Sequence, residues 1–117
     1  MRILLVDDDA PSAEALREIL EGEGHAVRTA QNGRVALEAL RDADRFDMIL
    51  LDVMMPVMNG YEFREEQLKD PSLASIPVIV LTADGRGRLK AALLKAKHVF
   101  QKPLSPPELL RVIGEYA

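Results

Sequence analysis

The stretch that decides the fold runs from Met48 to Gly60 and reads Met-Ile-Leu-Leu-Asp-Val-Met-Met-Pro-Val-Met-Asn-Gly. Its apolar run has no helical spacing, which predicts a strand buried on both faces. Pro56 and the pair Asn59-Gly60 predict a loop that turns into a helix. Asp52 is therefore expected at the carboxyl end of a buried strand, facing a loop, where open α/β proteins keep their chemistry.

Alternating patterns before and after this stretch predict a repeated strand and helix order. The expected strands are residues 2–6, 26–30, 48–52, 76–81 and 98–100, each followed by a helix. Such alternation requires parallel strands with right-handed crossovers and helices on both faces of the sheet. We therefore expect an α/β, doubly wound, three-layer domain. The chain has 117 residues and no linker or repeat, so residues 1–117 are expected to form a single domain.

Capping signals and apolar spacing predict the orientation of several helices. In the second helix the residues expected to face inward are Val35, Ala36, Ala39 and Leu40. The third helix is expected to begin with a capping box of Asn59 and Glu62, and its thin apolar face consists of Tyr61, Phe63 and Leu68. For the last helix the start signals are Ser105 as cap, Pro106 at the first position and Glu108 completing a capping box.

Composition excludes several classes of function. The chain lacks cysteine, which removes disulfides, thiol nucleophiles and thiolate metal sites. It offers neither a signal peptide nor an apolar run of membrane-spanning length, so we expect a soluble, cytoplasmic protein without membrane contact. The net charge of −4 combines −8 over residues 1–83 with +4 over residues 84–117. The basic excess is either a solvated helix face or a docking surface for an acidic partner; without interleaved aromatic residues, nucleic acid binding is not expected.

Polar residues follow the ends of the expected parallel strands and should meet at one edge of the sheet. They are Asp7, Asp8, Asp52, Thr82 and Lys102. Carboxylates packed together repel one another unless a cation holds them ionised. An all-oxygen ligand set suits a hard ion such as Mg²⁺, and neither histidine in the sequence has a partner at metal-ligand spacing.

The same residues form a complete set for phosphoryl transfer. An aspartate beside bound Mg²⁺ can attack phosphorus and form an aspartyl phosphate. Charge then develops on the phosphoryl oxygens and requires positive or donor groups already in place. Lys102 offers an ammonium group and Thr82 a hydroxyl, so Asp52 is the candidate acceptor.

Four motifs at the strand ends resemble the receiver domains of two-component response regulators, over the whole chain. They are Leu5-Val6-Asp7-Asp8, Leu51-Asp52-Val53-Met54-Met55-Pro56 with Asn59-Gly60, Val80-Leu81-Thr82-Ala83, and Lys102-Pro103. The resemblance implies a flavodoxin-like strand order of 2-1-3-4-5. It also implies that Asp52 is the phosphoacceptor, charged by a histidine kinase or a histidine phosphotransfer protein. Mg²⁺ would be held by Asp7, Asp8, Asp52 and the backbone carbonyl of Met54.

This resemblance implies a switch and not an ordinary enzyme. The domain would catalyse only its own phosphorylation and dephosphorylation, and the phosphorylated form would alter a surface that a partner reads. We expect that partner to be a downstream protein that docks near Arg86, Arg88 and Lys90, whose positive charge suits an acidic surface.

Several residues depart from the family pattern. Val99 stands where receivers often carry an aromatic residue, and Lys95 stands where glycine is common. Arg64 and Gln67 occupy third-helix positions that are commonly apolar. The interval from Thr82 to Lys102 is slightly short, which suggests a shortened or reoriented fourth helix.

Three other functions remain open at this stage. Asp7 and Asp9 form the Asp-x-Asp pair of phosphatases resembling haloacid dehalogenases, although Pro11 stands where that family has threonine. A receiver-like scaffold that no longer switches is a second alternative, prompted by Val99. A flavin-binding module is disfavoured because the first strand leads into aspartates and not into the Ser, Thr or Gly groups that cradle an anionic phosphate.

Overall fold

The computed structural model describes residues 1–42, 45–52, 58–82, 95–102 and 105–116. A five-stranded parallel sheet with the order β2-β1-β3-β4-β5 forms its centre. The strands are β1 (Arg2–Val6), β2 (Ala26–Ala30), β3 (Met48–Asp52), β4 (Val78–Thr82) and β5 (His98–Gln101). The described helices are α1 (Ala10–Gly22), α2 (Gly33–Arg41), α3 (Gly60–Lys69) and α5 (Pro106–Gly114). The predicted fold class and strand order are confirmed. The predicted fourth helix lies outside the described residues.

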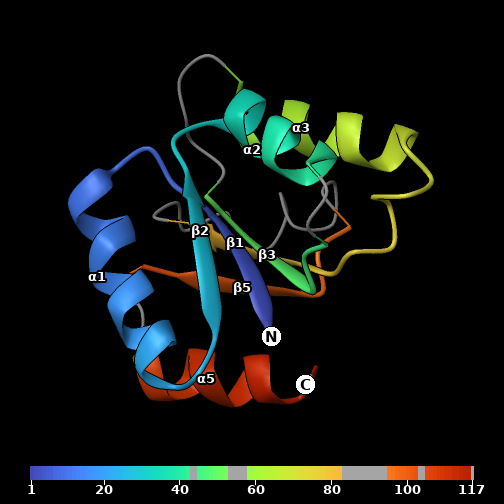
Figure 1. Cartoon of the computed structure of the whole chain (residues 1–117). Helices are drawn as coiled ribbons and strands as arrows, with labels where there is room; N and C mark the ends of the chain where they lie inside the picture. Colours follow the sequence, from blue (N-terminus) through green and yellow to red (C-terminus); the bar gives the residue numbers. More distant parts are fainter. Residues whose placement is uncertain (43–44, 53–57, 83–94, 103–104, 117) are drawn as a thin grey trace.

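The helices cover both faces of the sheet, as Figure 1 shows, with α2 and α3 on one face and α1 and α5 on the other. Successive residues of a strand point to opposite faces. In β1, Leu4 and Val6 accordingly join the core under α2 and α3, whereas Ile3 and Leu5 join the core against α1 and α5. The sheet therefore has two separate apolar cores, one on each face.

The central strands are more deeply buried than the edge strands. All residues of β3 and β4 are buried, as their continuous apolar runs predict. By contrast, β2 and β5 lie at the edges of the sheet and contain half-buried and exposed residues. The buried centre of the sheet thus carries Asp52, at the last position of β3.

Capping interactions fix where two of the helices begin. The Asn32 side chain accepts a hydrogen bond from the Val35 N–H at the start of α2. At α3 the predicted capping box is present, because Asn59 accepts from the Glu62 N–H and Glu62 accepts from the Asn59 N–H. The predicted box at α5 is wrong, since Ser105 is the N-cap but its side chain makes no capping hydrogen bond.

The inward faces of α2 and α3 differ from the predicted ones. Val35 is 38% exposed and Leu68 is 39% exposed. In α2, Leu37 is buried in place of Val35. In α3, Arg64 and Gln67 are buried while Leu68 lies on the solvent side. Apolar spacing locates a helix face only when the buried residues are apolar, and in α3 two of them are polar.

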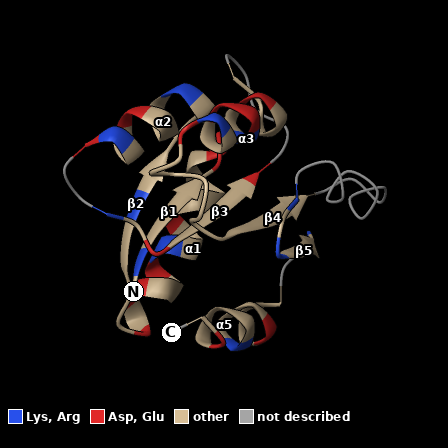
Figure 2. Cartoon of the chain, turned by 90° about the vertical axis from the view of Figure 1, so that its right-hand side faces the viewer, with Lys and Arg blue, Asp and Glu red and all other residues tan. Residues whose placement is uncertain are grey.

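Charged residues of both signs lie along the outer faces of α2 and α3, as Figure 2 shows. They form surface pairs within one helix, such as Arg34 with Glu38 at 3.8 Å and Lys69 with Glu66 at 3.3 Å. Exposed pairs of this kind contribute about 0.2–1 kcal/mol each at most. These faces are therefore solvated surfaces held to the sheet by their buried sides.

Among the helices of the described residues, none combines the length and the apolar character that crossing a membrane requires.

Candidate functional site

The sheet order brings the ends of β1 and β3 together. Val6 pairs with Leu51, so the residues that follow, Asp7 and Asp52, lie side by side at the carboxyl edge. The Asp7 N–H donates to the Ala30 carbonyl at 3.0 Å, which continues the β1–β2 pairing by one residue and holds Asp7 in place. Carboxylate oxygens of Asp7, Asp8 and Asp52 lie within 4.8 Å of one another. The structure thus unites the three aspartates that the sequence predicts as a cluster.

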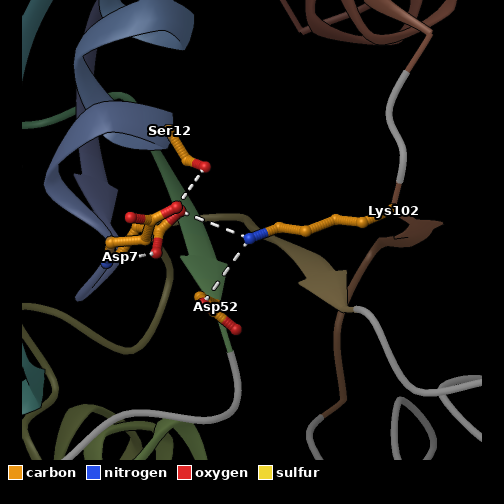
Figure 3. Close-up of polar contacts among 5 residues, drawn as sticks. Asp7, Ser12, Asp52 and Lys102 are labelled. Atoms are coloured by element: carbon orange, nitrogen blue, oxygen red, sulfur yellow. Dashed lines mark hydrogen bonds and ion pairs between the residues drawn. The ribbon is translucent and has the colours of Figure 1, made fainter.

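The Lys102 side chain extends into this cluster from the residue that follows β5, the edge strand (Figure 3). Its Nζ lies 3.3 Å from Oδ2 of Asp7 and 3.6 Å from Oδ2 of Asp52. Lys102 directly follows β5, and its backbone N–H donates to the carbonyl of Thr82, the last residue of β4, at 2.7 Å. Since Asp7 and Asp52 are both buried, the ammonium group balances charge where water can do so only in part.

Thr82 is buried at the last position of β4. It follows Leu81, which is the register partner of Asp52, so it belongs to the same edge of the sheet. The predicted Met54 carbonyl lies outside the described residues, and so do Arg86, Arg88 and Lys90. Of the predicted site residues, Asp7, Asp8, Asp52, Thr82 and Lys102 are therefore placed at one edge.

The third aspartate of the first loop has a different role. Asp9 is the N-cap residue of α1, and its backbone N–H donates to Oδ1 of Asp7 at 3.0 Å. Its carboxylate accepts a hydrogen bond from the Ser12 hydroxyl. Asp9 thereby orients the Asp7 carboxylate and holds the start of the helix. Ser12 is a site residue that was not predicted, and its sequence signal is its position three residues after an N-cap aspartate.

A cavity of about 520 Å³ opens beside the cluster, between α1 and α5. Its lining combines mostly apolar side chains with Asp7 of the cluster and with Lys102. The lining residues are Asp7, Ser12, Ala15, Leu16, Ile19, Leu81, Lys102 and Pro106. A group bound there would lie against Asp7 and Lys102 and would be flanked by apolar helix surface.

The aspartate cluster suits a hard divalent cation. It offers carboxylate oxygens from two buried residues and one exposed residue, Asp8. Mg²⁺ prefers one or two carboxylates together with water and phosphate oxygens, and the exposed side leaves room for such ligands. The donor set of the described residues therefore fits the ion that the sequence predicts.

Residues 3–114 match the family described as the response regulator receiver domain. The chain belongs to this family. As a receiver domain it is a component of two-component signalling, and the function predicted from the four motifs is confirmed at that level.

Individual relatives agree in sequence and in structure. A probable transcriptional regulator of Pyropia yezoensis is 40% identical over 117 residues, which cover 97% of this chain and 51% of that protein. The receiver domain thus spans about half the length of that relative. The chemotaxis response regulator CheY4 of Vibrio cholerae has a TM-score of 0.88 at 30% identity, with 99% of this chain and 98% of that chain covered. The response regulator TrrA of Thermotoga maritima, solved in complex with Mg²⁺ and BeF, has a TM-score of 0.87 at 31% identity and the same coverage of both chains.

Two of the departures from the family pattern, Lys95 and Val99, lie in the described part of the chain around β5. Lys95 has a φ of 53°, in the left-handed region that favours glycine, which explains why glycine is common there. Val99 packs against the core under α2 and α3, whereas Phe100 packs against the core on the other face. These two neighbouring side chains therefore lie on opposite faces of the sheet.

Proposed function

We propose that this receiver domain accepts a phosphoryl group on Asp52 in an Mg²⁺-dependent reaction. The observation that carries the proposal is the contact of Lys102 Nζ with both Asp7 and Asp52, within a cluster of carboxylates. Asp7, Asp8 and Asp52, together with the Met54 carbonyl implied by the family, would hold the ion. The TrrA structure supports this assignment, since it is described as a complex with Mg²⁺ and BeF.

In the proposed reaction a carboxylate oxygen of Asp52 forms a bond to phosphorus as the bond from phosphorus to the donor's imidazole nitrogen breaks. The leaving nitrogen keeps the electron pair. The Lys102 ammonium group and the Thr82 hydroxyl would interact with the phosphoryl oxygens, on which negative charge develops. When bound, Mg²⁺ supplies further positive charge beside those oxygens. Catalysis by the domain would be confined to its own phosphorylation and dephosphorylation.

The proposed donor is a histidine kinase or a histidine phosphotransfer protein. The cavity between α1 and α5 supports a protein donor, because it opens onto Asp7 and Lys102 and carries apolar side chains such as Ile19 at its rim. An imidazole-borne phosphate could approach Asp52 from this side. The downstream partner, its docking near Arg86, Arg88 and Lys90, and a cytoplasmic location stay predictions.

The proposal is tested with Asp52→Asn. Incubation with a small phosphodonor and Mg²⁺ should add one phosphoryl group to the wild-type chain, as measured by intact mass, and none to the variant. Asp47→Asn is the matched control, because Asp47 is an exposed carboxylate directly before the same strand and should leave labelling unchanged.

A phosphatase-like reaction gives a different result in the same assay. Labelling that persists in Asp52→Asn but disappears in Asp7→Asn would overturn the proposal and favour Asp7 as the nucleophile. The structure offers a reason to expect otherwise, since the carboxylate of Asp9, the second member of that pair, is engaged by Ser12 at the helix start.

A further inference from the structure

Two polar side chains are buried on α3, at positions where the family is commonly apolar. Arg64 is 7% exposed and Gln67 is 0% exposed. The Arg64 Nη1 donates to Oε1 of Gln67 at 2.7 Å, and the Gln67 Nε2 donates to the carbonyls of Leu73 and Ile76 at 2.9 and 3.2 Å. The pair therefore satisfies backbone carbonyls in the segment that leads into β4.

Arg64 also makes a contact that is distant in sequence. Its Nη2 donates to the Lys95 carbonyl at 3.2 Å. Lys95 is the residue with a left-handed φ of 53°, three positions before β5 begins. The three departures from the family pattern on α3 and before β5 are thus one connected set of hydrogen bonds.

This set is costly enough to require an explanation beyond packing. Burial disfavours the charged guanidinium and lowers the pKa of Arg64 below its ordinary value. An apolar side chain would fill the same space without that cost. An apolar residue lacks donors for the Gln67 side chain and for the carbonyl of residue 95, and the second of these hydrogen bonds joins α3 to the segment before β5.

The position of β5 depends on such contacts because this strand is short and lies at an edge of the sheet. β5 has four residues, its side chains are half-buried or exposed, and β4 is its neighbour in the sheet. Its start is held by the Lys97 N–H, which donates to the Val78 carbonyl at 2.9 Å, and its end by the Lys102 N–H on Thr82. Arg64, on α3, adds a hydrogen bond to the backbone at Lys95, three residues before β5 begins.

We propose that Arg64 is a positioning residue of the phosphoacceptor site and acts through β5 on Lys102. By fixing the backbone at Lys95, it limits how far the edge strand can shift, and so keeps the Lys102 ammonium between Asp7 and Asp52. The inference rests on the proposed function of Asp52. It adds a residue that makes none of its described contacts with the aspartate cluster.

The test is the affinity of the full chain for beryllofluoride with Mg²⁺, a phosphoryl mimic, measured by calorimetry. Arg64→Met keeps the length of the side chain and removes its donors. We expect about tenfold weaker binding, which is less than the roughly hundredfold effect that a 1 Å displacement at a reacting group can have. Arg64→Lys retains one donor and should recover part of the loss. Leu40→Ala, a core substitution on α2, is the control for lowered stability and should bind as the wild type does at temperatures where it is folded.

A double-variant comparison separates positioning from a general structural effect. If Arg64 acts through Lys102, then Arg64→Met should weaken binding no further in a Lys102→Ala background. Amide exchange at Lys97 and Lys102 should also be faster in Arg64→Met without any ligand. Equal affinity of Arg64→Met and wild type, or full additivity with Lys102→Ala, would overturn the proposal.

Failure of the underlying function gives a distinct pattern. If the wild-type chain itself does not bind beryllofluoride with Mg²⁺, then the phosphoacceptor function is wrong and the positioning role falls with it. Faster amide exchange in Arg64→Met would in that case assign the hydrogen bond to strand stability alone.

Discussion

Lys95 is a residue whose side chain conflicts with its backbone. At a φ of 53° the Cβ atom comes close to the following carbonyl oxygen, which costs about 1–2 kcal/mol in L-residues other than glycine. The hydrogen bond that its carbonyl accepts from Arg64 offsets part of this cost. Lys95 therefore combines a strained backbone with a hydrogen-bonded carbonyl.

Lys95→Gly should relieve this strain. Glycine adopts the left-handed region freely but loses more entropy on folding, so the free energy of unfolding should rise by about 0.5–1 kcal/mol. Urea denaturation measures the change. The matched control is Lys97→Gly, two positions on, where φ is not positive and the substitution should destabilise. A lower free energy of unfolding for Lys95→Gly would contradict the strain argument.

Asp70 provides a prediction on pH. The Ser72 hydroxyl donates to Oδ1 of Asp70 at 2.7 Å, and this bond, followed by that of the Ser72 N–H, holds the pKa of Asp70 below its ordinary value. Ser72→Ala should therefore raise the pKa of Asp70, as measured by NMR titration of its carboxyl carbon. Ser75→Ala, an exposed serine of the same loop, should leave it unchanged.

The sign of the stability effect follows from the lowered pKa in the folded state. Asp70 stabilises the fold at pH values above its unfolded pKa, and this contribution disappears as the pH falls through the folded pKa. The stability difference between wild type and Ser72→Ala should accordingly be largest near neutral pH and vanish in acid. A difference that grew on acidification would refute the assignment.

At the scale of elements, the start of α2 packs directly on the segment before α3. The Gly33 N–H donates to the Met58 carbonyl at 2.9 Å, and a Cβ at Gly33 would lie 2.8 Å from Met58 Cγ and 2.9 Å from Phe63 Cβ. These contacts are shorter than van der Waals distances allow. The helix can approach α3 this closely only because residue 33 lacks a side chain.

Gly33→Ala should consequently lower the free energy of unfolding by about 1–3 kcal/mol, the usual cost of overpacking. Gly114→Ala is the control, since it adds the same methyl group at the end of α5 with no atom within 4 Å. It should be neutral or stabilise by up to about 1 kcal/mol. Thermal denaturation of both variants measures the two changes in the free energy of unfolding. Equal changes in the two variants would argue against the close contact at Gly33.

The buried face of a helix or strand was predictable from the sequence where the residues on that face are apolar. The continuous runs of β3 and β4 predict full burial, and both strands are fully buried. The face of α3 was mispredicted because Arg64 and Gln67 are buried through hydrogen bonds to each other and to distant carbonyls. Hydrogen bonds to carbonyls distant in the sequence depend on the folded structure, so a pattern of apolar residues does not predict them.

At the scale of the whole molecule, the candidate site was predicted by topology. Parallel strands present their carboxyl ends at one edge, which brings Asp7, Asp52 and Lys102 together from distant positions. The supporting contacts were not predictable in the same way. The hydrogen bond from the Asp9 N–H to Asp7 depends on the conformation of one loop, and the strand-end rule says nothing about it.

Metal binding should stabilise the whole fold, because Mg²⁺ relieves the repulsion among carboxylates that folding brings together. At a tenfold excess over Kd the free energy of unfolding should rise by about 1.4 kcal/mol. Calorimetric melting with and without Mg²⁺ measures this. Asp7→Asn should lose most of the increase, whereas Glu18→Gln, an exposed carboxylate on α1, should retain it. An undiminished increase in Asp7→Asn would exclude a metal site at the cluster.

The contact between Lys102 and Asp7 joins residues that are 95 positions apart. During synthesis the aspartates leave the ribosome long before the lysine that balances their charge. A chain released before β5 would carry Asp7 and Asp52 without that ammonium group. Competence for phosphoryl transfer would then arise only when β5 has docked, so acceptance of a phosphoryl group would report that the chain has been made and folded as far as β5.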